Sequence, residues 1–440
     1  MNSMSFDTGQ SPKTLRCKDP SLALLPPSAF RCLHNERVNR TDAYGPERRC
    51  ELGGPRFVQA QNEIIRWPGY TVTPLALLPA LASDACIAAL YYKDEGTRFG
   101  LGSFKALGGA YAVLRLLARE IELRTGKSAV LATDLTSGTY HDITDSITVT
   151  CATDGNHGRS VAWGAKMFGA RCVIYVHESV SSGRVDAIAA YGAEVRRNPG
   201  NYDDAVRRAA QDAAANGWFV VSDTSYEGYV EIPRDVMQGY AVMVEEALRQ
   251  IPGKNPPTHV FVQAGVGGLA AAVCGHLWER LGAKRPRLIV VEPVNAACLY
   301  ESAKSGVLTA VHGSLDTIMA GLSCGEPSVI AWPLLNDGVD DFMAINDEPA
   351  AECMRLLASG RNGDPIIVAG ESAVAGLAGM LLAAQEPQTR AALGLTPAST
   401  VLVFGTEGDT DPELYRHIVG RDSAAVRAAA VRNVVDGAPL

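Results

Sequence analysis

The segment that decides the fold reads RFGLGSFKALGG and covers residues 98–109. Glycines precede Lys105, and an apolar pattern of helical period follows it, so we predict a helix that begins at this lysine. One face of that helix carries Leu107, Ala110, Tyr111, Leu114 and Leu117. Desolvation and the positive end of the helix dipole would both disfavour a charged amine at the helix start. We therefore predict a neutral Lys105 amine that forms a Schiff base with an aldehyde; the alternative is an ordinary surface lysine.

Outward from this segment, strand and helix patterns alternate from about Tyr70 to the end of the chain. The predicted strands are Ala89–Lys93, Ser146–Cys151, Cys172–Val176, Ala193–Arg197, Trp218–Ser222, His259–Gln263, Leu288–Val291 and Thr400–Gly405. Predicted helices include Lys105–Leu117, Gly158–Met167, Tyr202–Ala215 and Ile232–Gln250. Alternation of this kind predicts an α/β fold in which mostly parallel sheets are flanked by helices.

The chain has 440 residues, which exceeds one ordinary hydrophobic core and predicts two domains. Residues 1–55 are polar and broken by prolines, so we expect a partly irregular extension that covers a surface of the main body. We expect a larger domain from residues 56–105 and 223–435, a smaller mobile domain from 106–222, and a site in the cleft between them. The polar stretch Thr133–Asp145 is predicted to be a surface loop or an insertion.

The composition narrows the class of protein. A formal net charge of −8 argues against a nucleic-acid or anionic-membrane partner, and no run is apolar for long enough to span a membrane. The ten cysteines include no CxxC spacing, so neither a zinc ribbon nor another metal site is predicted. We expect a cytoplasmic protein with mostly reduced cysteines, and leave open a disulfide between Cys298 and Cys324.

A second candidate segment, TDGNHGR at residues 153–159, lies between a predicted strand and a predicted helix. Gly155 and Gly158 permit a tight turn, across which the Asn156 amide can face a ligand and donate to a phenolic oxygen. The alternative is that Asn156 simply caps the helix. His157 is interpreted as a packing residue at the helix start.

A third segment, VQAGVGGL at residues 262–269, runs from a strand through glycines into an apolar helix. Backbone N–H groups and the helix dipole at such a junction bind phosphate. The same glycines also match the dinucleotide pattern, with Glu292 placed where an acid would contact a ribose, so a nicotinamide enzyme is an alternative.

A fourth segment, FGTEGD at residues 404–409, follows the last predicted strand. Thr406 would place a neutral hydroxyl at the carboxyl edge of a sheet, where ligands of α/β proteins bind. If the ligand contains a pyridine ring, a hydroxyl opposite the ring nitrogen would leave that nitrogen largely neutral. A neutral nitrogen suits an elimination reaction. A turn stabilised by Thr406 and its glycine neighbours is the alternative.

The order of these segments resembles that of the fold-type-II pyridoxal-phosphate (PLP) enzymes, the group of threonine dehydratase and cysteine synthase. Within that group, the chain is similar to the diaminopropionate ammonia-lyases from about Tyr70 to Tyr415. The stretches that carry this resemblance are Arg98–Ala112, Thr153–Trp163, Asn201–Arg207, Asp223–Tyr229, Met237–Tyr240, Gly265–Gly268, Ile318–Pro327, Gly370–Ser372 and Thr406–Asp411. The N-terminal extension, the 133–145 stretch and Gly405, where a serine is common, depart from the pattern.

The resemblance implies a role for each candidate residue. Lys105 would bind PLP covalently and Asn156 would contact the ring oxygen, while Thr406 would face the pyridine nitrogen. The phosphate would lie on the glycine-rich loop of Gly265, Val266, Gly267 and Gly268. Asp154 would recognise a substrate ammonium or abstract a proton on the face opposite Lys105, and Asp223 would lie near the substrate amino group.

The implied reaction is elimination of ammonia from 2,3-diaminopropionate, as the D-isomer, the L-isomer or both, to give pyruvate. Two bases on opposite faces, Lys105 and Asp154, would explain the use of both isomers. The small amino-acid substrate and a homodimer are likewise implied by the resemblance. A serine, threonine or hydroxyaspartate dehydratase and a β-replacement synthase of the same fold are the alternative activities.

Overall fold

The computed structural model describes residues 25–153, 155–178, 180–200, 202–253 and 255–436, in which two sheets organise the chain. The strands are β1 (Phe30–His34), β2 (Leu75–Leu77), β3 (Ala89–Asp94), β4 (Thr148–Ala152), β5 (Arg171–His177), β6 (Glu194–Asn198), β7 (Phe219–Val220), β8 (His259–Gln263), β9 (Arg287–Pro293), β10 (Asp341–Ile345) and β11 (Thr400–Gly405). The larger sheet has seven strands in the order β1-β10-β9-β8-β11-β3-β2, and the smaller has four in the order β6-β5-β4-β7.

Most strand pairs in both sheets are parallel. The strands β10, β9, β8, β11 and β3 run parallel, and only the edge strands β1 and β2 pair antiparallel with their neighbours among the described residues. The smaller sheet is parallel throughout its described strands. Every residue of β8 is buried, as expected for a parallel strand covered by helices on both faces.

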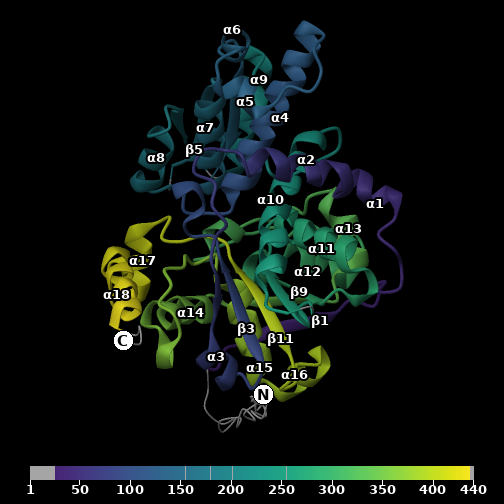
Figure 1. Ribbon diagram of the computed structural model, residues 1–440, viewed down its shortest axis with the longest axis vertical. Coiled ribbons are helices and arrows are strands. Elements are labelled where there is room, and N and C mark those ends of the chain that lie inside the picture. The colour runs from purple at the N-terminus through teal and green to yellow at the C-terminus, as the bar shows by residue number, and fades with distance from the viewer. Residues whose placement is uncertain (1–24, 154, 179, 201, 254, 437–440) are drawn as a thin grey trace, which may run out of the picture.

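The helices cover both sheets. They are α1 (Pro46–Glu51), α2 (Gly54–Ile64), α3 (Pro79–Asp84), α4 (Lys105–Thr125), α5 (Ala132–Thr136), α6 (His141–Thr144), α7 (Asn156–Phe168), α8 (Ser182–Ala189), α9 (Tyr202–Asn216), α10 (Glu231–Gln250), α11 (Gly268–Leu281), α12 (Cys298–Ser305), α13 (Ala331–Gly338), α14 (Asp347–Ser359), α15 (Ala375–Gln385), α16 (Pro387–Leu393), α17 (Pro412–Val419) and α18 (Ser423–Asp436). Figure 1 shows α4–α9 gathered with the smaller sheet at one end of the molecule, and α10–α16 around the larger sheet.

The two parts share a continuous hydrophobic core. One cluster of buried residues contains Val149 of β4, Leu114 of α4, Val242 of α10 and Val260 of β8. The helices α4 and α10 therefore connect the sheets, and the loops at the carboxyl ends of the strands meet between them.

The predicted strands and helices are confirmed, and the majority of their ends lie within a few residues of the predicted ends. Three strands were not predicted, namely β1, β2 and β10. The run that forms β10, DFMAI, is too short and apolar for periodicity to distinguish strand from helix. The extension contributes β1, whose Phe30 pairs with Ile345 and whose His34 pairs with Asp341, so residues 30–34 complete the larger sheet.

Two further expectations are corrected. The stretch Thr133–Asp145, predicted to be a loop or insertion, contains most of α5 and all of α6. The reason is tertiary, because the Glu63 carboxylate accepts from the Ala132 N–H at 3.0 Å and so stabilises the start of α5. The disulfide left open between Cys298 and Cys324 does not form, since Cys298 is a free thiol.

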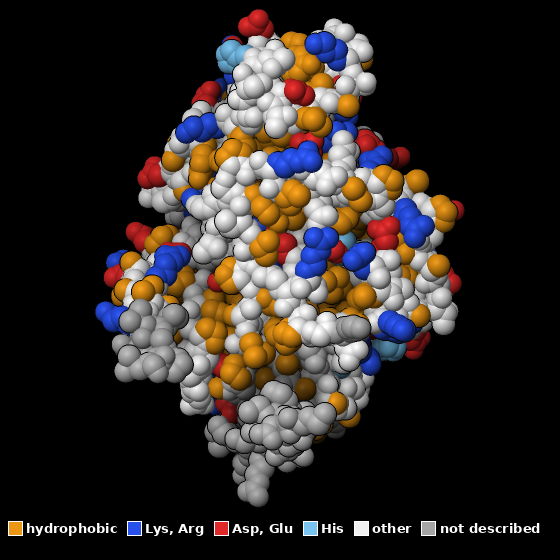
Figure 2. All heavy atoms as spheres, viewed as in Figure 1, with side chains coloured by type: hydrophobic (Ala, Val, Ile, Leu, Met, Phe, Trp, Pro, Cys, Tyr) orange, Lys and Arg blue, Asp and Glu red, His pale blue; other side chains and the backbone are white. Residues whose placement is uncertain are grey.

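The surface carries charges of both signs. On the face shown in Figure 2, Lys and Arg side chains are interspersed with Asp and Glu side chains, and hydrophobic side chains lie between them. Within the described ranges, none of the helices has the length and apolar character that crossing a membrane requires.

Candidate active site

Lys105 is the first residue of α4, and the loop before it is held by the segment that follows β11. The Phe104 N–H donates to Thr406 O at 2.9 Å, and the Gly408 N–H donates to Gly102 O at 2.9 Å. On the other side, the Ser160 hydroxyl of α7 donates to Lys105 O at 2.7 Å. Both parts of the molecule therefore fix the backbone of Lys105.

The Lys105 amine forms an ion pair with the carboxylate of Asp223. Burial alone would lower the pKa of the amine, but the Asp223 carboxylate outweighs burial and raises it. The sequence offered no partner for this charge, and the neutral amine predicted beside an aldehyde stays a prediction. The Asp223 carboxyl in turn has its pKa held well below the usual range by Lys105 and His157, against the opposing effect of burial.

His157 is the second residue of α7 and lies beside the same carboxylate. Its Nδ1 is 3.8 Å from Asp223 Oδ2, and its Nε2 donates to Val221 O at 2.8 Å. Burial lowers the pKa of the imidazole. Its approach to Asp223 had no signal in the sequence, because the two residues are 66 positions apart and meet only through the parallel pairing of β4 and β7.

Asn156 begins α7, but its side chain does not cap the helix. Thr153 takes that role, since its Oγ1 accepts from the N–H groups of Gly155 and Gly158 at 3.0 Å each. The Asn156 amide instead donates to Glu407 Oε2 at 2.5 Å. The helix-capping alternative is thus wrong, and the amide faces the loop that follows β11. The prediction for Asp154 lies outside the described residues.

The glycine-rich loop joins β8 to α11, as predicted. Gly267 has φ +101°, a left-handed conformation that glycine adopts without strain, and Gly268 is the first residue of α11. The first N–H groups of a helix have no partner within the helix, so they are available to an anion. A Cβ placed on Gly268 would lie 3.6 Å from Asp223 O, so the loop and the partner of Lys105 are adjacent.

Glu292 does not act as a ribose-binding acid. Its side chain is fully buried, and its two oxygens accept from the N–H groups of Leu299 and Tyr300 at 2.9 and 2.7 Å. These bonds cap the start of α12, which explains the position of the carboxylate at the end of β9. The Glu292 carboxylate, which favoured a nicotinamide enzyme, therefore stabilises a helix and does not bind a ribose.

Thr406 follows β11 and is buried. Its Oγ1 accepts from Gln263 Nε2 at 2.7 Å, so the last residue of β8 orients the hydroxyl. The next residue, Glu407, accepts from the Ser372 N–H at 3.1 Å as well as from Asn156. Sequence reasoning did not single out Gln263 or Glu407, although both follow or end buried strands, which is the signal that could have indicated them.

The residues present fit a phosphorylated pyridine aldehyde. The amine of Lys105 lies next to Asp223, and the glycine-rich loop at the start of α11 lies beside them. The Asn156 amide donates to Glu407, the residue that follows Thr406. All of them lie at the carboxyl ends of parallel strands, where α/β folds bind ligands.

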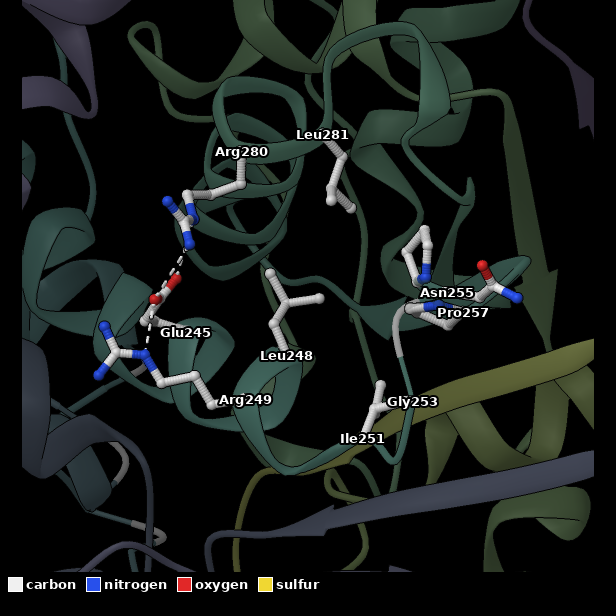
Figure 3. Close-up of a pocket in the computed structure, with 10 residues that line it drawn as sticks. Glu245, Leu248, Arg249, Ile251, Gly253, Asn255, Pro257, Arg280 and Leu281 are labelled. Carbon is white, nitrogen blue, oxygen red and sulfur yellow. Dashed lines mark hydrogen bonds and ion pairs between the residues drawn. The ribbon is translucent and has the colours of Figure 1, made fainter.

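A surface pocket lies elsewhere. It is lined by the C-terminal parts of α10 and α11, where Glu245 lies between Arg249 and Arg280 and pairs with both (Figure 3). Because α11 has 14 residues, this pocket is roughly 20 Å from the glycine-rich loop. Its charges are satisfied by one another, and it is not part of the site.

A scan against family models matches residues 66–404 to the pyridoxal-phosphate dependent enzymes. The match covers most of the chain and includes every described residue of the site except Thr406 and Glu407. The chain therefore belongs to the PLP-dependent enzyme family, and its helices and sheets have the fold-type-II arrangement.

Similar proteins narrow the family further. The chain is 40% identical over 385 residues to diaminopropionate ammonia-lyase of Escherichia coli K12, covering 84% of this chain and 94% of the relative. A solved structure of the E. coli enzyme in complex with D-serine has a TM-score of 0.80 at 36% identity, covering 91% of this chain and 99% of that one. Another, in complex with an aminoacrylate-PLP azomethine reaction intermediate, has a TM-score of 0.77 at 36% identity, covering 89% and 97%. The chain is thus a member of the diaminopropionate ammonia-lyase family.

Proposed function

We propose that this protein is a PLP-dependent carbon–nitrogen lyase that converts 2,3-diaminopropionate to pyruvate and ammonia. The observation that carries the proposal is the Lys105–Asp223 ion pair beside the glycine-rich loop, in a chain 40% identical to diaminopropionate ammonia-lyase. The ligands in the related E. coli structures, D-serine and an aminoacrylate-PLP reaction intermediate, support a small amino acid as substrate and elimination as the chemistry.

Bound PLP would supply the electron sink that stabilises the negative charge left when the α-proton is removed. Lys105 is the residue we propose to hold the cofactor and to exchange a proton with the substrate. The Lys105 amine must lose its proton before it can bond to an aldehyde carbon, and the Asp223 carboxylate with which it pairs lies where it can receive that proton. His157 lies beside the same carboxylate. A base and an acid placed correctly contribute roughly 10²–10⁴-fold to such a step.

The remaining contacts orient the cofactor. We propose that Asn156 binds the ring oxygen, that Gly265, Val266, Gly267 and Gly268 bind the phosphate, and that Thr406 faces the ring nitrogen. The Gln263 amide that donates to Thr406 Oγ1 supports a hydroxyl turned toward a neutral nitrogen. A protonated nitrogen would need a carboxylate at that position, and Thr406 is not one.

Asp154 is proposed to recognise the substrate's side-chain ammonium, or to act as the base for the D-isomer opposite Lys105. The variant Asp154→Asn should then lose turnover of D-diaminopropionate by a factor much larger than its loss with the L-isomer. Pyruvate release measured with each pure isomer provides the comparison. Equal losses with the two isomers would remove this stereochemical role.

The experiment for the main proposal is spectroscopic. The purified protein with PLP should absorb at roughly 410–420 nm, as lysine Schiff bases of PLP do. Borohydride should remove the band and add the cofactor mass to the peptide that contains Lys105. Adding DL-diaminopropionate should release pyruvate and two ammonia per turnover. A protein that binds PLP but releases no pyruvate would contradict the proposed substrate.

A hydroxy-amino-acid dehydratase is the second candidate, because a related structure carries D-serine. Turnover of D- and L-serine against diaminopropionate, each with and without a thiol nucleophile, separates elimination of ammonia from dehydration and from β-replacement. We expect diaminopropionate to be preferred by a large factor in kcat/KM.

The boundaries of the domains also belong to the proposal. We infer a smaller mobile domain at 106–222 and a larger one at 56–105 and 223–435, supported by the smaller sheet, whose four strands lie between Thr148 and Val220. Closure of the smaller domain would exclude water from the reacting carbon. A homodimer and a cytoplasmic location complete the proposal, and light scattering of the purified holoenzyme tests the oligomeric state.

A further inference from the structure

Arg184 links the two parts of the molecule beside the proposed cofactor site. It lies in α8, on the side of the smaller sheet, and its guanidinium reaches two loops of the larger-sheet side. The distance from a terminal nitrogen to Glu371 Oε1 is 3.1 Å, and Nε is 3.4 Å from Asp411 Oδ2. The Glu371 side chain is only 2% exposed, so one end of this link is buried.

The stem of the same arginine supports the turn that precedes Asn156. Gly155 has φ +151°, and a Cβ placed on it would lie 3.2 Å from Arg184 Cδ. The methylene groups of Arg184 therefore pack directly on this turn. A shift of Arg184 would remove the surface on which the backbone before Asn156 rests.

Asn156 itself is held by the same two loops. Glu407 accepts from the Asn156 amide, from the Ser372 N–H at 3.1 Å and from the Thr410 hydroxyl at 3.0 Å. Since Ser372 follows Glu371 and Thr410 precedes Asp411, the partners of Arg184 and Asn156 lie on neighbouring residues. Among the described residues, the turn is thus attached to the larger-sheet side through the Asn156 amide and through Arg184.

The charges make Arg184 important for this attachment. Burial raises the pKa of the Glu371 carboxyl, and the nearby Glu407 carboxylate raises it further, while Arg184 lowers it. The net effect still raises the pKa of Glu371, to about 8, so the link rests on geometry: the Arg184 guanidinium contacts Glu371 and Asp411, and without it these acidic groups would lose the cation that both of them contact.

We propose that Arg184 is a positioning residue for the elimination reaction. Through Glu371 and Asp411 it holds residues 155–156 against the larger-sheet loops, which sets the position of the Asn156 amide toward the pyridine ring. The inference rests on the proposed function for its link to PLP, but the attachment itself is a property of the chain alone.

The first test needs no cofactor. In Arg184→Gln, amide hydrogen exchange of residues 156–159 should accelerate roughly tenfold, which corresponds to about 1.4 kcal/mol of local opening. Arg184→Lys should recover part of the protection. The control is Arg171→Gln in β5, whose guanidinium pairs with the exposed Asp145. Unchanged exchange in Arg184→Gln would overturn the proposal.

The second test uses the holoenzyme. Arg184→Gln should weaken PLP binding roughly tenfold and shift the cofactor absorption maximum, with Glu371→Gln showing a smaller effect in the same direction. The double variant should lose no more than Arg184→Gln alone, because both changes break one link. Additive losses would overturn the link. If the wild-type protein binds PLP without releasing pyruvate, the proposed substrate fails while this test remains valid.

Discussion

The charges beneath the larger sheet and those around the smaller sheet are arranged in opposite ways. Lys93, Glu95, Arg98 and Glu246 form a buried network, with Lys93 Nζ and an Arg98 nitrogen each 2.7 Å from Glu246 Oε2 and side chains 0–5% exposed. Around the smaller sheet, Arg171–Asp145 and Arg196–Glu194 pair at 2.8 and 2.7 Å with side chains 37–64% exposed. Removing one partner of a buried ion pair lowers the free energy of unfolding strongly, whereas an exposed ion pair contributes little to that free energy.

This difference fits a fixed lysine beneath the smaller domain that we propose to be mobile. Arg98 belongs to the buried network and begins the segment that ends at Lys105, so the network fixes the approach to the lysine. The smaller sheet carries its charges in solvent and is attached to the site through a few links, among them Arg184. Four substitutions and one pH series test this comparison, from the largest expected effect to the smallest.

Breaking the buried network should have the largest effect. In Arg98→Met, the carboxylates of Glu95 and Glu246 remain buried with only Lys93 opposite them, so the free energy of unfolding should fall by about 3–5 kcal/mol. Urea denaturation followed by fluorescence measures the change. Arg171→Met, at an exposed pair, is the control. A loss in Arg98→Met as small as in the control would contradict the comparison.

The close contact between α4 and α10 should give the next largest effect. A Cβ on Gly239 would lie 2.2 Å from Leu107 O, so Gly239→Ala should push the helices apart and cost about 1–3 kcal/mol. Gly183 in α8 has no atom within 4 Å of such a Cβ. Gly183→Ala should therefore be neutral or slightly stabilising, and thermal unfolding of both variants should separate them. Equal melting temperatures would refute the prediction.

The buried carboxyl of Glu292 should make stability depend on pH. Burial raises its pKa to about 8, above the value in the unfolded chain. Its contribution is fully present below the unfolded pKa and is lost as the pH rises through about 8. The free energy of unfolding should thus fall by at most ~1.4 kcal/mol per pH unit between roughly pH 5 and 8. Glu292→Gln should make this slope shallower, because Glu371 and Asp94 also have raised pKa values, and the exposed Glu36→Gln should leave it unchanged.

An exposed pair of the smaller sheet should give the smallest effect. Arg171→Gln removes the partner of Asp145, whose side chain is 50% exposed, and water can replace the lost contact. The urea midpoint should stay within replicate error at moderate salt. A loss of unfolding free energy comparable to that of Arg98→Met would show that the smaller sheet depends on its surface charges, contrary to this prediction.

Local sequence patterns predicted the bounds of several strands and helices, although each pattern alone is weakly specific. The bounds of β8 and β11 were predicted to the residue, since each is a short β-rich run that ends at glycine-containing loops. The start of α4 at Lys105 followed from glycines placed before an apolar period, whereas α7 begins at Asn156, two residues before the predicted Gly158. The helix α5 was missed because Glu63, far away in the chain, stabilises its start.

The sequence by itself determined the fold class, the position of the lysine and the glycine-rich loop, because each depends on a few neighbouring residues and a period of two or 3.6. Only the tertiary structure decided the charge on Lys105, the donation from Asn156 to Glu407 and the link from Arg184 to Glu371. These pairs are separated by more than one hundred positions. Which of them meet depends on the order of strands in two sheets, and no local pattern encodes that order.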